Sequence, residues 1–478
     1  MTKSLLPYLF LALGLCCGTC GRAQIYDVRD FGATGRGDDT EAIQRAIDVV
    51  SQNGGTLLFP ADTFSTGMIE LRSNMEIKLQ AGAVWRAIPD LVRYPEMSFS
   101  TADLSQKDGF TMTRRAFILG RSIHHFSLTG PGKIYPSGDR HDAFPDHESN
   151  GAKRPYGLYF IDSYHLRITD LELENSAFWM LRLYRCDDVT LRGIRLWNHA
   201  NTNNDGIDLV DCHRVTVSDC VIDSSDDALC LKSEAPRGCR DIVITNCIVS
   251  STASYIKLGT AGFGAFERIA VSNCVLRTTR AEEIIHGLQI PQGITGLAMM
   301  SPDGATMRHI SFDNIVMEGL SCPIFVRLSN RFRVTHAEYA NHPMTPGVVE
   351  DISFSNIRAY GVGALPVVIS GYPGHPVRRV RLNDVIIHGG RPGTLTDKEL
   401  KYPDNDGGYP SPLMFGTDLP AYGAFLRYAE DVRFDDVAFV PAAGEVRAPV
   451  VTLGSKHTVL REVYADGKLL RQRDLRKK

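Results

Sequence analysis

The sequence predicts an all-β fold, a single-stranded right-handed parallel β-helix in which successive coils stack into a solenoid. A short phrase recurs downstream of residue 156, in which a polar residue or Gly, most often Asn or Asp, precedes an apolar residue or Cys. The apolar members of this phrase are Leu171, Ile194, Cys220, Cys247, Cys274, Ile315, Ile357, Val385 and Val437. The first five are 23 to 27 residues apart, which is a period typical of solenoids. Around each phrase Ile, Val, Leu and Thr alternate with polar residues, as in half-buried strands.

Stacked coils place equivalent residues above one another, because neighbouring strands lie roughly 4.8 Å apart. We therefore expect Cys220, Cys247 and Cys274 to form a ladder inside the solenoid. Eight of the 11 cysteines lie beyond residue 23, and these eight lack the C-x-x-C spacing of a zinc site. We expect mostly reduced, buried thiols, with no metal site and no cofactor. The longer intervals between phrases predict inserted loops, which in solenoids often wall a groove.

The amino-terminal residues 1–23 have the pattern of a signal peptide. Lys3 provides a charged start, an apolar run follows, and residues 21–23 have the small-x-small pattern of a cleavage site. Neither this run nor any later segment has the length and apolar character of a membrane span. We expect export to the periplasm or the extracellular space, with lipid attachment to a cysteine of this segment as the alternative.

The remaining residues 24–478 are expected to form one catalytic domain, because a solenoid is a single elongated domain. Asp38 or Asp39 is suited to capping a helix that starts near Thr40, and Gly54-Gly55 ends that helix. Such a helix covers the open apolar end of the solenoid. Strands are expected next, at Thr56–Phe59 and Met75–Leu79.

The formal charge of −3 and the 22% of charged residues exclude the strongly basic surface that a nucleic-acid partner needs. A polysaccharide or oligosaccharide is the partner that the site residues below favour. The oligomeric state stays open.

Three acidic residues stand out in the stretch from residue 203 to 233, namely Asp205, Asp226 and Asp227. About one coil separates Asp205 from the other two, so we expect all three side chains on one face of adjacent coils. Crowded carboxylates repel, and at least one pKa should rise. A protonated acid beside ionised carboxylates is the pair of groups that cleaves glycosidic bonds. The alternative is that Asn-Asp-Gly and Asp-Asp simply form turns at coil corners.

The segment from Ser176 to Ser233 resembles the polygalacturonase family, glycoside hydrolase family 28. The resemblance rests on Asn-x-Asp-Gly-x-Asp at residues 203–208 and on Asp-Asp followed by Lys-Ser at residues 226–233. The phrase DFGATGRGDDTEAIQRAID also resembles the amino-terminal segment of many pectin-degrading β-helix enzymes. The resemblance covers most of residues 25–440, and it implies the β-helix fold, hydrolysis with inversion of configuration and a role in pectin degradation.

The resemblance also implies roles for individual residues. Asp226 would be the general acid, and Asp205 and Asp227 would hold and deprotonate the attacking water. Asn203 and Lys232 would support the carboxylates or the sugar.

Two of the family's motifs are altered in this chain. The position of Gly-His-Gly is taken by Ala253-Ser254-Tyr255, and the Arg-Ile-Lys motif that binds the substrate carboxylate has no convincing match around His286. Homogalacturonan, a rhamnogalacturonan and another uronate-containing glycan therefore all stay open as substrates.

Other side chains are candidates for contacting a sugar. Trp179 and Tyr255 offer aromatic rings, although core packing is an equally good account of Trp179. A cationic side chain can meet a uronate carboxylate, and Arg does so with a bidentate fork. The candidates of this kind are Lys257, Arg327, Arg331 and Arg333. Surface charge is the alternative for each of them.

Two further functions remain open from the sequence alone. One is a polysaccharide lyase on the same fold, in which clustered carboxylates bind Ca²⁺. The other is a carbohydrate-binding β-helix without catalysis. A lyase leaves unsaturated, ultraviolet-absorbing product ends, whereas a hydrolase does not.

Overall fold

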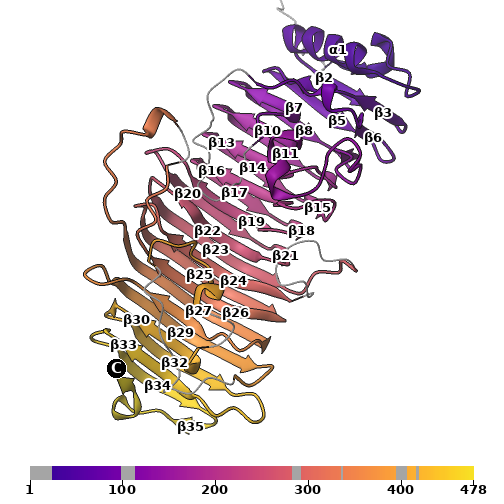
Figure 1. Ribbon diagram of the computed structural model, residues 1–478. Coiled ribbons are helices and arrows are strands. Elements are labelled where there is room, and N and C mark those ends of the chain that lie inside the picture. The colour runs from indigo at the N-terminus through magenta and orange to yellow at the C-terminus, as the bar shows by residue number, and fades with distance from the viewer. Residues whose placement is uncertain are drawn as a thin grey trace, which may run out of the picture.

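The fold was analysed in a computed structural model, in which short parallel strands wind into stacked coils (Figure 1). The described residues are 24–97, 113–282, 292–334, 337–393, 406–415 and 419–477. The signal peptide expected at residues 1–23 and the region around His286 lie outside the described residues.

One face of the solenoid is a 13-stranded sheet in which every pairing is parallel. Its strands are β4 (Ile69–Glu70), β7 (Ala116–Arg121), β10 (Tyr156–Ile161), β13 (Leu181–Tyr184), β16 (Ile207–Val210), β19 (Leu229–Ser233), β22 (Ser254–Gly262), β24 (Gly293–Ser301), β26 (Leu320–Leu328), β28 (Val367–Ser370), β30 (Ala421–Arg427), β33 (Ala448–Leu453) and β36 (Arg476–Lys477).

The other faces form a 23-stranded sheet, which is parallel except where β34 pairs with β35. Its strands are β1 (Ile25–Asp27), β2 (Thr56–Phe59), β3 (Thr63–Thr66), β5 (Met75–Leu79), β6 (Val84–Ala87), β8 (His124–Thr129), β9 (Lys133–Tyr135), β11 (Tyr164–Thr169), β12 (Glu172–Glu174), β14 (Asp187–Arg192), β15 (Arg195–Asn198), β17 (His213–Ser218), β18 (Val221–Ser224), β20 (Cys239–Thr245), β21 (Ile248–Ser251), β23 (Phe266–Leu276), β25 (Thr306–Glu318), β27 (Val348–Val362), β29 (Val377–Gly389), β31 (Ala429–Glu430), β32 (Arg433–Val440), β34 (Val459–Ala465) and β35 (Lys468–Leu469). A central coil therefore adds one strand to the first sheet and two to the second, as β13, β14 and β15 do. The predicted parallel β-helix is confirmed.

The helix α1 (Thr40–Asn53) lies across the amino-terminal end of the stack (Figure 1). Its buried face is made of Ala42, Ile43, Ala46, Ile47 and Val50, which join the core of the first coils. Asp38 accepts a hydrogen bond from the backbone N–H of Thr40 over 3.0 Å, and Gly54 follows the last turn. The predicted capping helix is confirmed, as are the predicted strands β2 and β5.

The polar member of the repeated phrase has a left-handed backbone in each copy. Its φ is +58° at Asp219, +56° at Asn246 and +55° at Asn273, for example. Gly adopts this region at least cost because it has no Cβ, and the short polar side chains of Asn and Asp favour it through local hydrogen bonds. The recurrent Asn or Asp of the sequence therefore suits the left-handed backbone of the coil corner.

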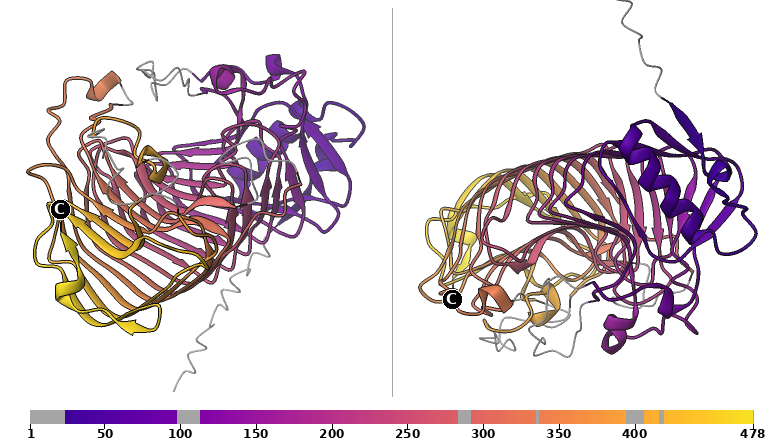
Figure 2. Two further views of the ribbon diagram at one scale, coloured as in Figure 1. Left: turned by 60° about the horizontal axis from the view of Figure 1, so that its bottom comes forward. Right: turned by 90° about the horizontal axis from the view of Figure 1, so that it is seen from above.

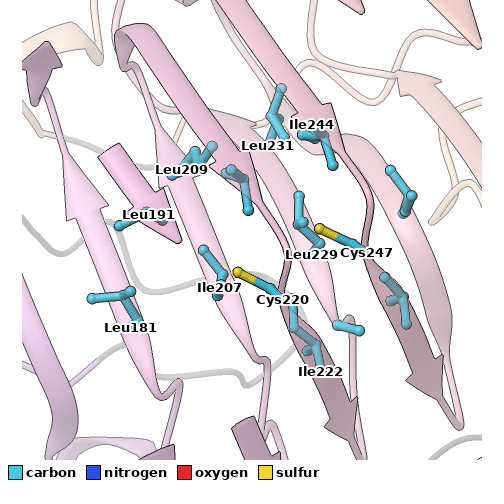
Figure 3. Close-up of a cluster of buried hydrophobic side chains, with 14 of the residues drawn as sticks. Leu181, Leu191, Ile207, Leu209, Cys220, Ile222, Leu229, Leu231, Ile244 and Cys247 are labelled. Carbon is cyan, nitrogen blue, oxygen red and sulfur yellow. The ribbon is translucent and has the colours of Figure 1, made fainter. Parts of the chain in front are cut away.

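The apolar member of the phrase points into the solenoid. Cys220, Cys247 and Cys274 are all buried there, and the registers of β18, β21 and β23 place them on successive coils. Figure 3 shows the first two of these cysteines, Cys220 and Cys247. The eight cysteines of the described residues are buried and unpaired, as expected. One apolar cluster reaches from Val28 in the first coil to Leu475 near the last.

The two sheets differ in how their outer faces are covered. Strands of the 23-stranded sheet alternate between buried and exposed residues, as in β20 and β25. Strands β10, β13, β16, β19, β22 and β26 of the 13-stranded sheet are instead buried at every residue. A parallel sheet buried throughout is one that is covered on both faces. Loops therefore cover the outer face of this sheet.

Short 3₁₀ turns mark the covering loops. The turns η3 (Glu148–Lys153), η4 (Ala337–Tyr339) and η5 (Pro412–Phe415) lie on one side of the solenoid in both views of Figure 2. Other short turns are η1 (Val28–Phe31), η2 (Leu91–Arg93) and η6 (Gln472–Asp474). Within the described part of the chain, no helix is long and apolar enough to cross a membrane.

The coil corners make a stability prediction. Asn246→Val should lower the free energy of unfolding by about 1 kcal/mol more than Asn246→Gly, because a β-branched residue is strained at positive φ and Gly is not. Both variants lose the hydrogen bonds of the Asn246 side chain with Asp219 and Thr245, so the loss of these bonds does not contribute to the difference between them. Chemical denaturation measures it, and equal stabilities of the two variants would contradict the explanation.

Candidate active site

The three predicted carboxylates meet on the outer face of the 13-stranded sheet. Asp205 lies just before β16, and Asp226 and Asp227 lie just before β19, the neighbouring strand. One carboxylate oxygen from each residue lies within 4.8 Å of the other two. The backbone continues the ladder here, since Gly206 donates its N–H to the Asp227 carbonyl over 2.9 Å. The register of adjacent coils therefore brings the three acids together.

Lys232 contacts both Asp205 and a fourth acid, Asp208. Its Nζ atom is 2.7 Å from Oδ2 of Asp205, and it also donates a hydrogen bond to Asp208, the last residue of the Asn-x-Asp-Gly-x-Asp motif. The same ammonium lies 3.4 Å from the ring centroid of Trp179. All four side chains are buried. Lys232 thus balances the charge of the carboxylates from within the site.

Lys257 contacts Asp227 in the way that Lys232 contacts Asp205. It comes from β22, and its Nζ lies 2.5 Å from Oδ2 of Asp227. The Nζ also donates to the hydroxyl of Tyr409 over 3.1 Å. Tyr409 belongs to the long excursion between β29 and β30, so the site combines residues that are far apart in the sequence.

These contacts give the acids different pKa values. Burial raises the pKa of Asp205 well above its usual range, despite the opposing effect of Lys232. Burial likewise raises the pKa of Asp208 to about 6. Burial also acts on Asp227, but Lys257 and Lys232 outweigh it and hold the pKa of Asp227 below its usual value. Asp227 is therefore the acid whose charged form the site favours most strongly.

Asp226 differs from its two partners in being only half-buried. Its Oδ1 accepts a hydrogen bond from the backbone N–H of Asp227 over 2.8 Å, and its carbonyl accepts from the hydroxyls of Ser224 and Ser251. The backbone around Asp226 is therefore fixed while its side chain reaches solvent. That placement is required of a group that exchanges a proton with a bound molecule.

The side chain of Asn203 is held by a hydrogen bond from Arg154. The guanidinium donates a 2.9 Å hydrogen bond to Oδ1 of Asn203, and it lies 4.9 Å from the ring centroid of Phe178. Arg154 is fully buried, and Asn203 has a left-handed φ of +53°. Sequence reasoning did not identify Arg154, because a single Arg in an irregular segment carries no pattern.

Two predicted sugar-contacting aromatics are instead packed inside the protein. Trp179 is 5% exposed and stacks on Phe178 with ring centroids 5.6 Å apart. Tyr255 is fully buried in the main apolar cluster and donates its hydroxyl hydrogen to the Gly319 carbonyl over 3.2 Å. Trp179 supports Lys232 from beneath, whereas Tyr255 lies away from the carboxylates.

Two of the predicted arginines, Arg327 and Arg331, make internal ion pairs. Arg331 binds the buried Asp303 with a 2.9 Å contact from Nε and donates to the Thr260 carbonyl over 3.0 Å. Its guanidinium lies 5.9 Å from the Tyr409 ring centroid, so Arg331 borders the site through Tyr409. Arg327 instead binds Asp406. Asp208 and Tyr409 are thus two further residues of the site that the sequence prediction did not include.

The chain is similar to known polygalacturonases. Over 223 residues the chain is 26% identical to a protein described as a probable polygalacturonase from Vitis vinifera, covering 44% of this chain and 45% of that protein. It is 22% identical to an exopolygalacturonase from Platanus acerifolia, over 84% of this chain and 99% of that protein. The chain thus spans less than half the length of the first relative and nearly the whole of the second.

A solved structure shares the fold. The family 28 exopolygalacturonase from Yersinia enterocolitica superposes with a TM-score of 0.66 at 19% identity, over 94% of this chain and 79% of that chain. The family model described as "Glycosyl hydrolases family 28" matches residues 56–404, which is most of the chain and includes all three carboxylates. The chain therefore belongs to glycosyl hydrolase family 28.

Proposed function

We propose that the protein is an inverting glycoside hydrolase that cleaves glycosidic bonds in a pectic or other uronate-containing glycan. One observation carries this proposal: three carboxylates from adjacent coils lie within 4.8 Å of one another, and lysines contact two of them. Membership of the family supports the reaction class. Inversion follows from the resemblance to polygalacturonases.

Each carboxylate has a role that suits its surroundings. Asp226 is the general acid that protonates the leaving oxygen, and its half-exposed side chain can reach a glycan. Asp205 and Asp227 hold the attacking water, and Asp227, whose lowered pKa favours the charged form, accepts its proton. Lys257 keeps Asp227 ionised, which a base requires. Lys232 positions Asp205 by direct contact, and Asn203 supports the carboxylates or the sugar, as the resemblance to the family implies.

The cations near the site reduce the repulsion that an anionic sugar would meet there. Lys232, Lys257 and Arg331 all lie within one or two side chains of the triad. Each is paired with a carboxylate, so together they lower the cost of bringing a uronate next to several acids. The relatives named as polygalacturonases support a pectic glycan in particular.

A calcium-dependent lyase is supported less well. Calcium ligation requires carboxylate oxygens that face a shared cation. Here Lys232 already contacts Asp205 at 2.7 Å and Lys257 contacts Asp227 at 2.5 Å. The two ammonium groups provide the positive charge that a calcium ion would supply.

We further infer that residues 24–478 act as one exported catalytic domain. The continuous apolar cluster from Val28 to Leu475 supports a single folding unit. The signal-peptide pattern of residues 1–23 supports export. Expression of the full chain in a secreting bacterial host, followed by N-terminal sequencing, should give a mature protein that starts near residue 24. An intact first residue on the exported protein would contradict this.

The reaction is tested by incubating the purified protein with homogalacturonan, rhamnogalacturonan and other uronate-containing oligosaccharides. We expect saturated products with inverted anomeric configuration, read by mass, absorbance and NMR. Asp226→Asn should lower kcat by about 10²–10⁴-fold, which is the usual contribution of a general acid. Asp241→Asn is the matched control, since Asp241 pairs with Arg268 on the exposed sheet. Unsaturated products would establish the lyase, and full activity of Asp226→Asn would exclude the assigned acid.

The contact between Lys257 and Asp227 predicts how the activity depends on pH. Lys257 lowers the pKa of Asp227, so Lys257→Met should raise it and leave Asp227 protonated at higher pH. The acid limb of the kcat–pH profile should therefore move to higher pH. Arg268→Met, which removes an exposed cation, is the control and should leave the profile in place. An unchanged acid limb in Lys257→Met would show that Asp227 is not the titrating base.

A further inference from the structure

The outer face of the 13-stranded sheet is covered on the carboxyl-terminal side of the triad. Ala298, Phe325 and Val368 point outward from β24, β26 and β28, where Phe415 and Leu419 of the excursion pack against them in one buried apolar cluster. The floor of a groove that binds a glycan would be exposed and polar here. These strands therefore offer no continuation of the site towards the later coils.

Asp406 fixes one end of the covering segment 406–415. It accepts hydrogen bonds from Arg327 and Arg427, two arginines of β26 and β30 that are almost wholly buried, and the Arg427 contact is 3.1 Å. Its carbonyl also accepts the N–H of Asn330 over 2.9 Å. Buried guanidinium groups are costly unless they are paired. Asp406 is therefore a strong attachment point, and Phe415 in the apolar cluster is the second.

Tyr409 lies between these two attachment points and projects to the triad. Its hydroxyl is 3.1 Å from Nζ of Lys257, which in turn contacts Asp227. The guanidinium of Arg331 lies 5.9 Å from its ring centroid. The side chain nevertheless remains 51% exposed. An exposed aromatic ring held by two cations presents a fixed apolar face next to the reacting groups.

The amino-terminal side of the triad is covered as well. Tyr159 of β10 and Tyr184 of β13 are both about 1% exposed, and they belong to one buried apolar cluster with Met97 and Phe178. The triad thus lies between two covered stretches of the same sheet, with Asp226 and Tyr409 as its more exposed members.

We propose that the segment 406–415 closes the site on the side of the later coils, so that a glycan enters by its end and its terminal part contacts Tyr409. This rests on the proposed function, and it adds the mode of attack: cleavage at chain ends rather than within the chain. Tyr409 is a residue that determines specificity, and Asp406 positions it.

The first test uses the wild-type protein and polymeric homogalacturonan. A closed site releases short products of one size from the start, and the viscosity of the polymer falls slowly relative to the number of new reducing ends. A ladder of intermediate oligosaccharides in the initial phase, with a rapid fall in viscosity, would overturn the closure.

A binding experiment separates this proposal from the proposed reaction. Dissociation constants of oligogalacturonides of increasing length are measured on Asp226→Asn, which needs no turnover. A closed site predicts affinity that stops improving after the first few sugars. Affinity that improves with each added sugar would overturn closure even in an active hydrolase, and absence of binding at every length would overturn both proposals. A wild-type protein that binds but hydrolyses nothing would refute only the reaction.

The role of Tyr409 is tested by substitution. Tyr409→Ala should raise KM for short oligogalacturonides about tenfold with a smaller change in kcat, because one aromatic contact to the sugar is lost. Tyr409→Phe keeps the ring and should retain most of the affinity. Tyr360→Ala removes a tyrosine that is 44% exposed on the other sheet, and it is the matched control. An unchanged KM in Tyr409→Ala would overturn the assignment.

Asp406→Asn weakens the attachment of the segment without touching Tyr409. We expect longer oligosaccharides among its initial products, together with a circular dichroism spectrum equal to that of the wild type. A product profile identical to that of the wild type in a folded Asp406→Asn protein would show that Asp406 does not hold the segment 406–415 in place.

Discussion

The in-register stacking of parallel coils is the constraint on which the rest of the structure depends. Because the backbone of each coil bonds to the next, a residue and its counterpart one coil later must lie close together. Gly206 bonds to the Asp227 carbonyl, and this ladder leaves Asp205 and Asp226 no freedom to separate. The same rule lines up the cysteines inside and the left-handed corners outside. The clustering of the three carboxylates and the order of the core therefore have the same cause.

Stacking like charges in this way has an electrostatic cost. Asp205, Asp208, Asp226 and Asp227 crowd one small region, and burial of three of them opposes their ionisation. Lys232 and Lys257 offset that cost from neighbouring strands, each in direct contact with an acid. Because the two cations contact different acids, the pKa values of the carboxylates differ. Such a difference allows groups of the same chemical type to take different tasks.

Patterns confined to one coil were predictable from the sequence. The corners of the repeated phrase carry Asn, Asp or Gly, the next position carries a buried apolar residue or Cys, and the separation of Asp205 and Asp227 in the sequence matches one turn of the repeat. The orientation of the two aromatic side chains was not predictable in the same way. Trp179 and Tyr255 were both plausible partners for a sugar, yet one packs under Lys232 and the other lies inside the core. Whether an aromatic ring points outward or into the core depends on its packing against the neighbouring coil. The repeat pattern of the sequence does not predict that packing.

The sequence by itself determined the fold, the family and the acid triad, because these depend on a repeat length and on residues within about one coil of each other. Only the tertiary structure decided what surrounds the triad. Tyr409 reaches Lys257 from an excursion 152 residues further along the chain, and Asp406 unites arginines from two other strands. Such contacts are made between loops and distant coils, where no period relates the partners, so their geometry exists only once the solenoid has folded.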